Sequence, residues 1–127
     1  MNSEKPTPGQ KWNLVEMMKG KKDFITMIGD YKTDSPAPFL NEMSIHFFRL
    51  NKGQADTQRP HLQAELYYVL SGSRHLKITA DGKETSVELI QGDIVYVPAR
   101  APHKFMGDNE ISLLVFFAPN YTGPEEA

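Results

Sequence analysis

The chain has 127 residues, a formal net charge of −2 and no cysteine. A chain of this length most simply forms one domain, which buries roughly two thirds of its unfolded surface. The lack of cysteine excludes disulfides and thiolate metal sites, so a transition-metal site would have to use imidazole, carboxylate or amide ligands.

Charge and hydropathy also limit the partners. Lys and Arg are scattered along the chain, without the basic stripe that a nucleic acid backbone would follow. Residues 1–13 are polar, contain two prolines and lack the apolar core of a secretory signal. No run approaches the roughly 18 apolar residues of a membrane helix. We therefore expect a cytoplasmic protein that binds neither nucleic acids nor membranes.

The first elements are a leader and a helix. Residues 1–11 are predicted to be disordered. Residues 13–20 then have the marks of a short helix, with Asn13 as N-cap, Glu16 three residues later and Gly20 as the C-terminal stop. This helix precedes a series of short strands.

The strand segments are rich in β-branched and aromatic residues and end at glycine, proline or Asp-Gly turns. Such spacing of turn signals is typical of an antiparallel sandwich or barrel. We expect an all-β domain over 12–119, a core barrel at about 42–118, and a polar tail at 120–127. The predicted strands are 24–31, 42–50, 66–70, 74–80, 84–90, 93–98 and 110–118.

A polar row precedes one of these strands. Residues an even number apart share one face of a strand, so the row would begin polar and become apolar. Such a row suits the wall of a cavity with a wet mouth, and it also suits an exposed edge strand. The row comprises Arg59, His61, Gln63, Glu65, Tyr67 and Val69.

A second segment, Gly92 to Phe105, carries another histidine. Pro98 ends a hydrophobic strand, and His103 follows a second proline in a short constrained loop. Alone, this histidine has no assigned role.

Together the two segments resemble the two motifs of the cupin superfamily. The first motif, G-x5-H-x-H-x3-E-x6-G, matches Gly53, Arg59, His61, Glu65 and Gly72 at intact spacing, with Arg59 in place of the first histidine. The resemblance implies a double-stranded β-helix, or jelly-roll barrel.

The second motif, G-x5-P-x-G-x2-H-x3-N, matches Gly92, Pro98, Arg100, His103 and Gly107, with Arg100 for glycine and Gly107 for asparagine. Cupins usually hold one divalent metal with these motif histidines and the glutamate. By resemblance, His61, Glu65 and His103 are the metal ligands.

Arg59 leaves three alternatives open, because a guanidinium is always protonated and cannot bind a metal. Arg59 could turn away and leave two imidazoles and one carboxylate, as in non-haem iron oxygenases. Gln63 could supply an amide oxygen as a fourth ligand. Alternatively, the metal is lost, and Arg59 and Arg100 bind an anion.

These residues predict a small metal-binding cupin, of oxygenase or isomerase type, acting on a small polar organic molecule. The metal would be Fe, Mn, Ni or Zn. A non-catalytic module that binds a small anion or sugar is the alternative. His46 is a further candidate for the pocket. By resemblance we also expect a homodimer, in which residues 24–31 either pair with a partner or within their own chain.

Overall fold

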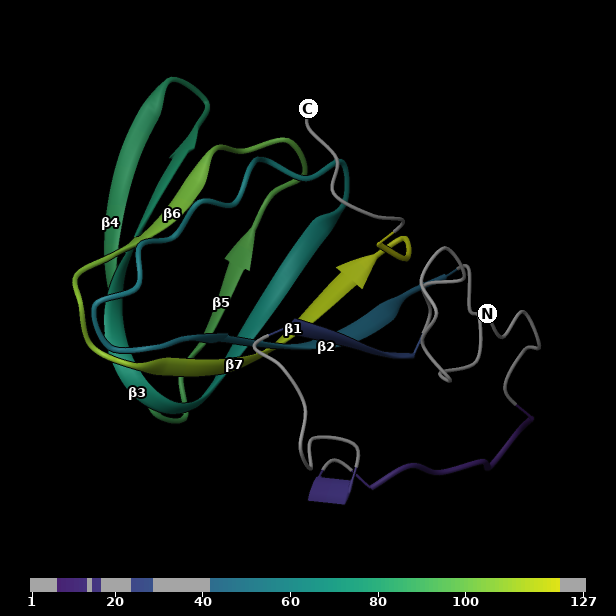
Figure 1. Ribbon diagram of the computed structural model, residues 1–127. Helices are drawn as coiled ribbons and strands as arrows, with labels where there is room; N and C mark the ends of the chain where they lie inside the picture. Colours follow the sequence, from purple (N-terminus) through teal and green to yellow (C-terminus); the bar gives the residue numbers. More distant parts are fainter. Residues whose placement is uncertain (1–6, 14, 17–23, 29–41, 122–127) are drawn as a thin grey trace.

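The computed structural model describes residues 7–13, 15–16, 24–28 and 42–121, with only the backbone for 24–28. The described part is built mainly from antiparallel strands (Figure 1). This confirms the predicted all-β antiparallel barrel. The strands are β1 (Phe24–Ile28), β2 (Ser44–Leu50), β3 (Ala64–Ala80), β4 (Lys83–Ile90), β5 (Ile94–Val97), β6 (His103–Met106) and β7 (Ile111–Ala118).

Strand β3 runs through both layers of the barrel. Its first half pairs with β5 on one side and β7 on the other, in a layer that continues through β2 to β1. Its second half pairs with β4 and β6 in the other layer. In Figure 1 the β4 and β6 strands therefore lie apart from β1, β2 and β7. A side chain from each half of β3 can thus face the same interior.

The prediction of two strands at 66–70 and 74–80 was wrong, because β3 is continuous. Its register shifts between Val69 and Ser71, and the inward-facing positions change from odd to even numbers. Gly72 then adopts φ +81°, and a Cβ there would lie 1.9 Å from the Glu110 carbonyl oxygen. The glycine marks a bulge and a close backbone approach inside a strand rather than a turn.

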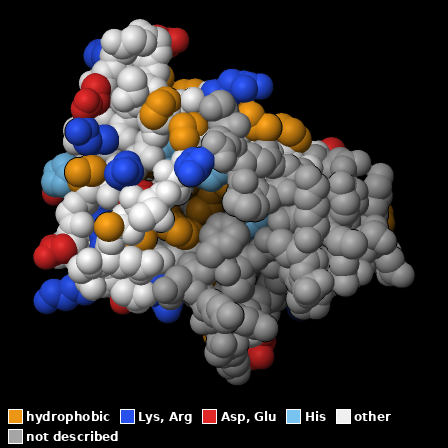
Figure 2. All heavy atoms as spheres, turned by 45° about the horizontal axis from the view of Figure 1, so that its top comes forward, with side chains coloured by type: hydrophobic (Ala, Val, Ile, Leu, Met, Phe, Trp, Pro, Cys, Tyr) orange, Lys and Arg blue, Asp and Glu red, His pale blue; other side chains and the backbone are white. Residues whose placement is uncertain are grey.

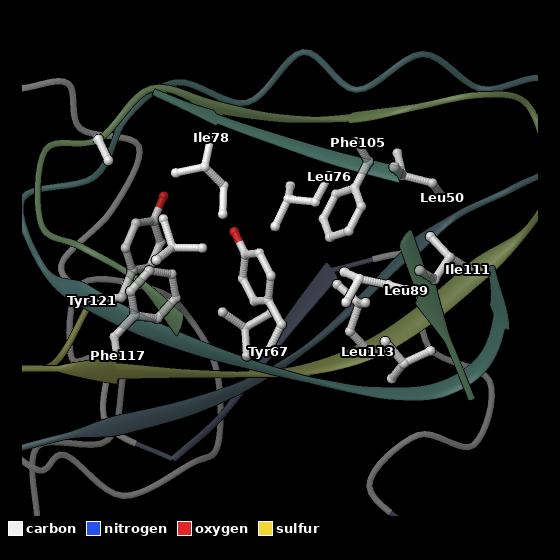
Figure 3. Packing of buried hydrophobic residues seen from close by; sticks show 14 residues of the cluster. Leu50, Tyr67, Leu76, Ile78, Leu89, Phe105, Ile111, Leu113, Phe117 and Tyr121 are labelled. Atoms are coloured by element: carbon white, nitrogen blue, oxygen red, sulfur yellow. The ribbon is translucent and has the colours of Figure 1, made fainter. Parts of the chain in front are cut away.

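The core lies between the two layers (Figure 3). The Tyr67 ring occupies the middle of this view, with Phe117 and Tyr121 to one side and Phe105 with aliphatic side chains to the other. Tyr67, Val69 and Leu76 are almost completely buried. The largest part of the driving force for folding comes from such apolar burial.

The predictions for the two ends of the chain can be compared with the structure only in part. The Glu16 amide donates to Asn13 Oδ1 at 3.1 Å, which is the bond an N-cap makes, while most of the predicted helix lies outside the described residues. The predicted leader is described only at residues 7–11, and residues 29–31 of the first predicted strand are also outside. Asn120 and Tyr121, expected in a polar tail, are buried.

Segment 24–28 pairs with β2 of its own chain. Within the described residues, no helix is long and apolar enough to cross a membrane.

Candidate metal centre

His61, Glu65 and His103 meet inside one end of the barrel. His61 lies in the loop before β3, Glu65 is the second residue of β3 and faces inward, and His103 begins β6 in the opposite layer. Glu65 Oε2 lies 3.0 Å from His61 Nδ1 and 3.4 Å from His103 Nε2. One donor atom from each residue lies within 4.8 Å of the other two.

The two separations from Glu65 Oε2 suit a single metal ion. Donors bound to one first-row metal at about 2.1 Å lie roughly 3.0–3.4 Å apart at octahedral or tetrahedral angles. Glu65 is 2% exposed, and its Oε1 atom is buried without a hydrogen-bond partner among the described residues. An unpaired buried carboxylate oxygen is costly, and a cation would satisfy it. The cluster could therefore hold a metal ion.

The His103 ring is oriented with one nitrogen toward this cluster. Its Nδ1 lies 2.8 Å from the Ala101 carbonyl oxygen, which can only accept a hydrogen bond, so Nδ1 carries the proton. In the neutral ring, Nε2 then presents a lone pair toward Glu65. Such a second hydrogen bond is the usual way proteins fix a metal-binding histidine. His103 was expected in a loop, but it pairs with Ile78 across β3 and β6.

Gln58 is a site residue that sequence reasoning missed. Its Oε1 lies 3.1 Å from His103 Nε2, and the Tyr67 hydroxyl donates to the same oxygen at 3.4 Å. The Asp56 carboxylate accepts hydrogen bonds from both the backbone N–H and the side-chain amide of Gln58. The alternation of faces that was expected for residues 59–65 does not hold before Ala64. Strand β3 begins only there, and the residues before it, Pro60 among them, are not in a strand.

Gln63 was a candidate fourth ligand on that same predicted face. Its side chain is buried, and its Nε2 donates to the Asn120 carbonyl oxygen at 3.2 Å. The described residues that line the cavity beside the cluster do not include Gln63.

This cavity has a volume of about 170 Å³. That volume is below the roughly 300–1,000 Å³ of sites for drug-sized ligands. Burial, followed by the neighbouring Glu65 carboxylate, raises the pKa of the Tyr67 hydroxyl well above its usual value, so this group stays protonated at neutral pH and can donate a hydrogen bond. The described residues that line the cavity are Phe48, Gln58, His61, Glu65, Tyr67, Val115, Phe117 and Tyr121.

The space-filling view in Figure 2 shows a recess near the middle of one face of the molecule. In Figure 2, hydrophobic and histidine side chains are visible in this recess, and several Lys and Arg side chains lie on the surface to its left.

Comparison with known proteins places the chain in a family. The family model described as a cupin domain matches residues 46–117, which span both motifs and every strand from β2 to β7. The chain belongs to the cupin family. An uncharacterized protein of Streptomyces coelicolor is 40% identical to this cupin over 84 residues, which cover 64% of the chain and 76% of that protein.

Solved cupin structures share the fold. Bacillus subtilis oxalate decarboxylase, described with Mn(II) centres, superposes with a TM-score of 0.59 and 23% identity, covering 65% of this chain and 22% of the decarboxylase. A chain from the crystal structures of the DMSP lyases RdDddP and RnDddQII superposes with a TM-score of 0.61 and 21% identity. The match covers 75% of this chain and 46% of that chain. This cupin thus spans less than half of either structure, and the likeness concerns the fold.

The two arginines in the cupin motifs are both exposed. Arg59 stands at the position of the first motif histidine, and neither Arg59 nor Arg100 is among the described residues that line the cavity. Arg100 has φ +67°, which explains the glycine that cupins usually have there. Its backbone N–H donates to the His61 carbonyl oxygen at 2.7 Å, so this turn supports a candidate ligand through the main chain.

His46 lies behind the cavity wall instead of in it. It is completely buried, and its Nε2 lies 2.7 Å from Ser44 Oγ. The centroid of its ring lies 5.1 Å from that of Phe117 and 5.4 Å from that of Tyr121, both in edge-to-face geometry. The same two aromatic rings also contact His61. Burial, with a smaller effect from His61, lowers the pKa of His46 to about 3. His46 is therefore a neutral histidine that packs behind the aromatic wall of the cavity.

Proposed function

We propose that this protein is a metal-dependent cupin enzyme, of oxygenase or isomerase type, that acts on a small polar organic molecule. The observation that carries the proposal is the convergence of His61, Glu65 and His103 beside a cavity. Two imidazoles and one carboxylate form a donor set with open positions, which is the set that non-haem iron oxygenases use. The candidate metals are Fe, Mn, Ni and Zn, and the Mn(II) of the fold neighbour oxalate decarboxylase is one reason to include manganese.

When bound, the metal would supply a Lewis acid and a point of attachment for an oxygen atom of the substrate. The chain's own residues would do the rest. Phe117 and Tyr121, stacked at 4.8 Å, and Val115 would exclude water and select a small ligand. Tyr67 would donate a hydrogen bond to a substrate oxygen, because its raised pKa keeps the hydroxyl protonated and makes it a poor proton-transfer acid.

Glu65 is the one carboxylate among the described residues of the cavity wall. As a ligand, it would not be free to act as a general base. A reaction that begins with proton abstraction would therefore need a base outside this set, and the arrangement favours reactions that the metal and Tyr67 can start.

Oxygen consumption tests the enzymatic part of the proposal. The protein, loaded in turn with Fe²⁺, Mn²⁺, Ni²⁺ and Zn²⁺, is offered a panel of small diols, thiols and keto acids, and oxygen uptake and product formation are measured. Turnover that is lost in a His61→Ala variant supports the proposal. Saturable binding of a small anion or sugar to the loaded protein, without turnover of any panel member, would instead indicate the non-catalytic binding module.

We also propose a homodimer, formed through the outer face of the layer that contains β3, β5 and β7. Leu66 pairs with Tyr96 and with Phe116, and Tyr68 pairs with Ile94, so these side chains lie next to one another. They are 37–66% exposed. A contiguous exposed apolar patch of this kind is typical of a protein–protein interface.

Light scattering coupled to size-exclusion chromatography tests this interface. An Ile94→Lys, Tyr96→Lys double variant should be monomeric, while Met106→Lys, which changes an exposed apolar residue of β6, should remain dimeric. A monomeric wild-type protein would rule out the homodimer.

A further inference from the structure

We propose that Gln58 supplies a fourth donor to the metal through its amide oxygen, and that Asp56 positions this amide. The inference rests on the proposed metal site but concerns residues at unspecified positions of the first cupin motif, between Gly53 and Arg59. It also replaces Gln63, the amide that strand spacing had suggested, by another glutamine of the same segment.

Asp56 determines which end of the Gln58 amide faces the cluster. Gln58 Nε2 donates to Asp56 Oδ2 at 2.7 Å, and the Gln58 backbone N–H donates to Oδ1 at 3.1 Å. An ionised carboxylate can only accept, so it selects the NH₂ end of the amide and leaves the oxygen end for the opposite side. The amide oxygen is therefore the atom presented to His103.

Asp56 is itself held firmly in place. It is 5% exposed, and its Oδ2 also accepts from the Phe105 backbone N–H of β6 at 2.8 Å. The same strand carries His103, two residues earlier. One carboxylate thus fixes the Gln58 amide relative to the strand that supplies a candidate ligand.

The surroundings of Gln58 Oε1 are suited to a cation. His103 Nε2, 3.1 Å away, has a lone pair in the neutral ring, because Nδ1 donates to the Ala101 carbonyl oxygen. Glu65 Oε2 approaches the same nitrogen at 3.4 Å. Three acceptors that converge in a buried space repel one another unless a proton or a metal lies between them. Among the described residues, the Tyr67 hydroxyl donates to the amide oxygen, but at 3.4 Å this hydrogen bond is weak.

An amide oxygen in place of an imidazole changes which metals the site prefers. The donor set becomes two imidazole nitrogens and two oxygens. Oxygen donors suit Mn²⁺ better than they suit the later metals, for which imidazole is the stronger ligand. We infer that Gln58 shifts the preference of the site toward Mn²⁺ relative to Zn²⁺, compared with a site that has histidine at this position.

Metal affinities, measured by competition with a chromophoric chelator, test the inference without reference to activity. Gln58→Leu should weaken Mn²⁺ binding at least tenfold, while Gln63→Leu, which removes the other buried amide of the segment, should change it less than threefold. Gln58→His should restore binding and increase the ratio of Zn²⁺ to Mn²⁺ affinity at least tenfold. Asp56→Asn, which frees the amide to rotate, should weaken Mn²⁺ binding, with partial recovery in an Asp56→Asn, Gln58→His double variant.

The two proposals fail in different ways. Wild-type affinity in Gln58→Leu, together with lost binding in His61→Ala, would overturn the role of Gln58 and leave the metal site intact. An effect of Gln63→Leu that exceeds that of Gln58→Leu would assign the fourth donor to Gln63 instead. If the wild-type protein binds none of the metals, both proposals are wrong. Circular dichroism establishes that each variant is folded, and Gln58→Ala replaces Gln58→Leu if that variant is not.

Discussion

Glu65 Oε2 and His103 Nε2 lie 3.4 Å apart although the two residues come from opposite layers of the barrel. Glu65 belongs to the half of β3 that pairs with β7, and His103 to β6, which pairs with the other half of β3. A metal bound between them would connect the two layers. Metal binding should therefore stabilise the fold as well as complete the site.

Metal addition is expected to raise the unfolding temperature. A ligand at 100 times its Kd adds about 2.7 kcal/mol to the free energy of unfolding, which corresponds to roughly 10 °C for a domain of this size. Thermal melts with Mn²⁺ or Zn²⁺, and with a chelator, measure this shift. His75→Ala, which changes an exposed histidine, should retain the full shift, whereas a His61→Ala variant that also retains it would contradict the assigned ligands.

Gly72 should not tolerate a side chain. A Cβ at this position would lie 1.9 Å from the Glu110 carbonyl oxygen, and the backbone has φ +81°. We expect Gly72→Ala to lower the free energy of unfolding by about 3 kcal/mol, from the left-handed conformation and the clash together. Gly82→Ala is the matched control, with φ +72° but open space around the Cβ, and should cost only about 1 kcal/mol. Equal costs in urea denaturation would show that the contact with Glu110 is unimportant.

Arg100 occupies a conformation that suits glycine, with φ +67°. The left-handed region costs a non-glycine residue roughly 1–2 kcal/mol, part of which is offset by the greater unfolded-state entropy of glycine. Arg100→Gly should therefore be more stable than Arg100→Ala by about 0.5–1 kcal/mol in denaturant titrations. The bond from the residue 100 amide to the His61 carbonyl oxygen is kept in both variants. A glycine variant that is no more stable than the alanine variant would show that the left-handed backbone at residue 100 does not limit stability.

His46 should make the protein less stable as the pH falls. Its pKa is lowered to about 3 by burial, and to a smaller extent by His61, from an ordinary value of 6.5. Between these values the unfolded chain binds a proton that the folded protein does not, so the free energy of unfolding falls as pH decreases from about 6.5, by up to about 1.4 kcal/mol per pH unit.

Urea titrations at several pH values, in the presence of a chelator, measure that slope. His46→Gln should show a weaker dependence on pH than the wild-type protein between pH values of about 4.5 and 6.5. His75→Gln, at an exposed histidine, is expected to leave the slope unchanged. Identical slopes in the wild-type protein and His46→Gln would show that His46 is not the group responsible.

Strand composition and turn signals predicted the barrel because they are local properties, while His61, Glu65 and His103 were predicted from the resemblance to the cupin motifs. The continuity of β3 was not predicted, because Ser-Gly-Ser usually signals a turn. Here the glycine is needed inside the strand, where its backbone lies close to the Glu110 carbonyl oxygen. Gln58 was also missed, because spacing in steps of two applies only inside a strand and the chain before Ala64 is irregular. The burial of Tyr121 could not be predicted either, because it involves a residue far away in sequence. The Tyr121 backbone N–H donates to Ser44 Oγ at 2.9 Å.

The metal content of the purified protein tests the central claim most directly. We expect elemental analysis, after reconstitution and removal of free metal, to give close to one Fe, Mn, Ni or Zn ion per wild-type chain and almost none in a folded His61→Ala, His103→Ala double variant. His75→Ala should retain the wild-type stoichiometry. An unchanged metal content in the double variant, or a wild-type protein that takes up none of the four metals, would contradict the account.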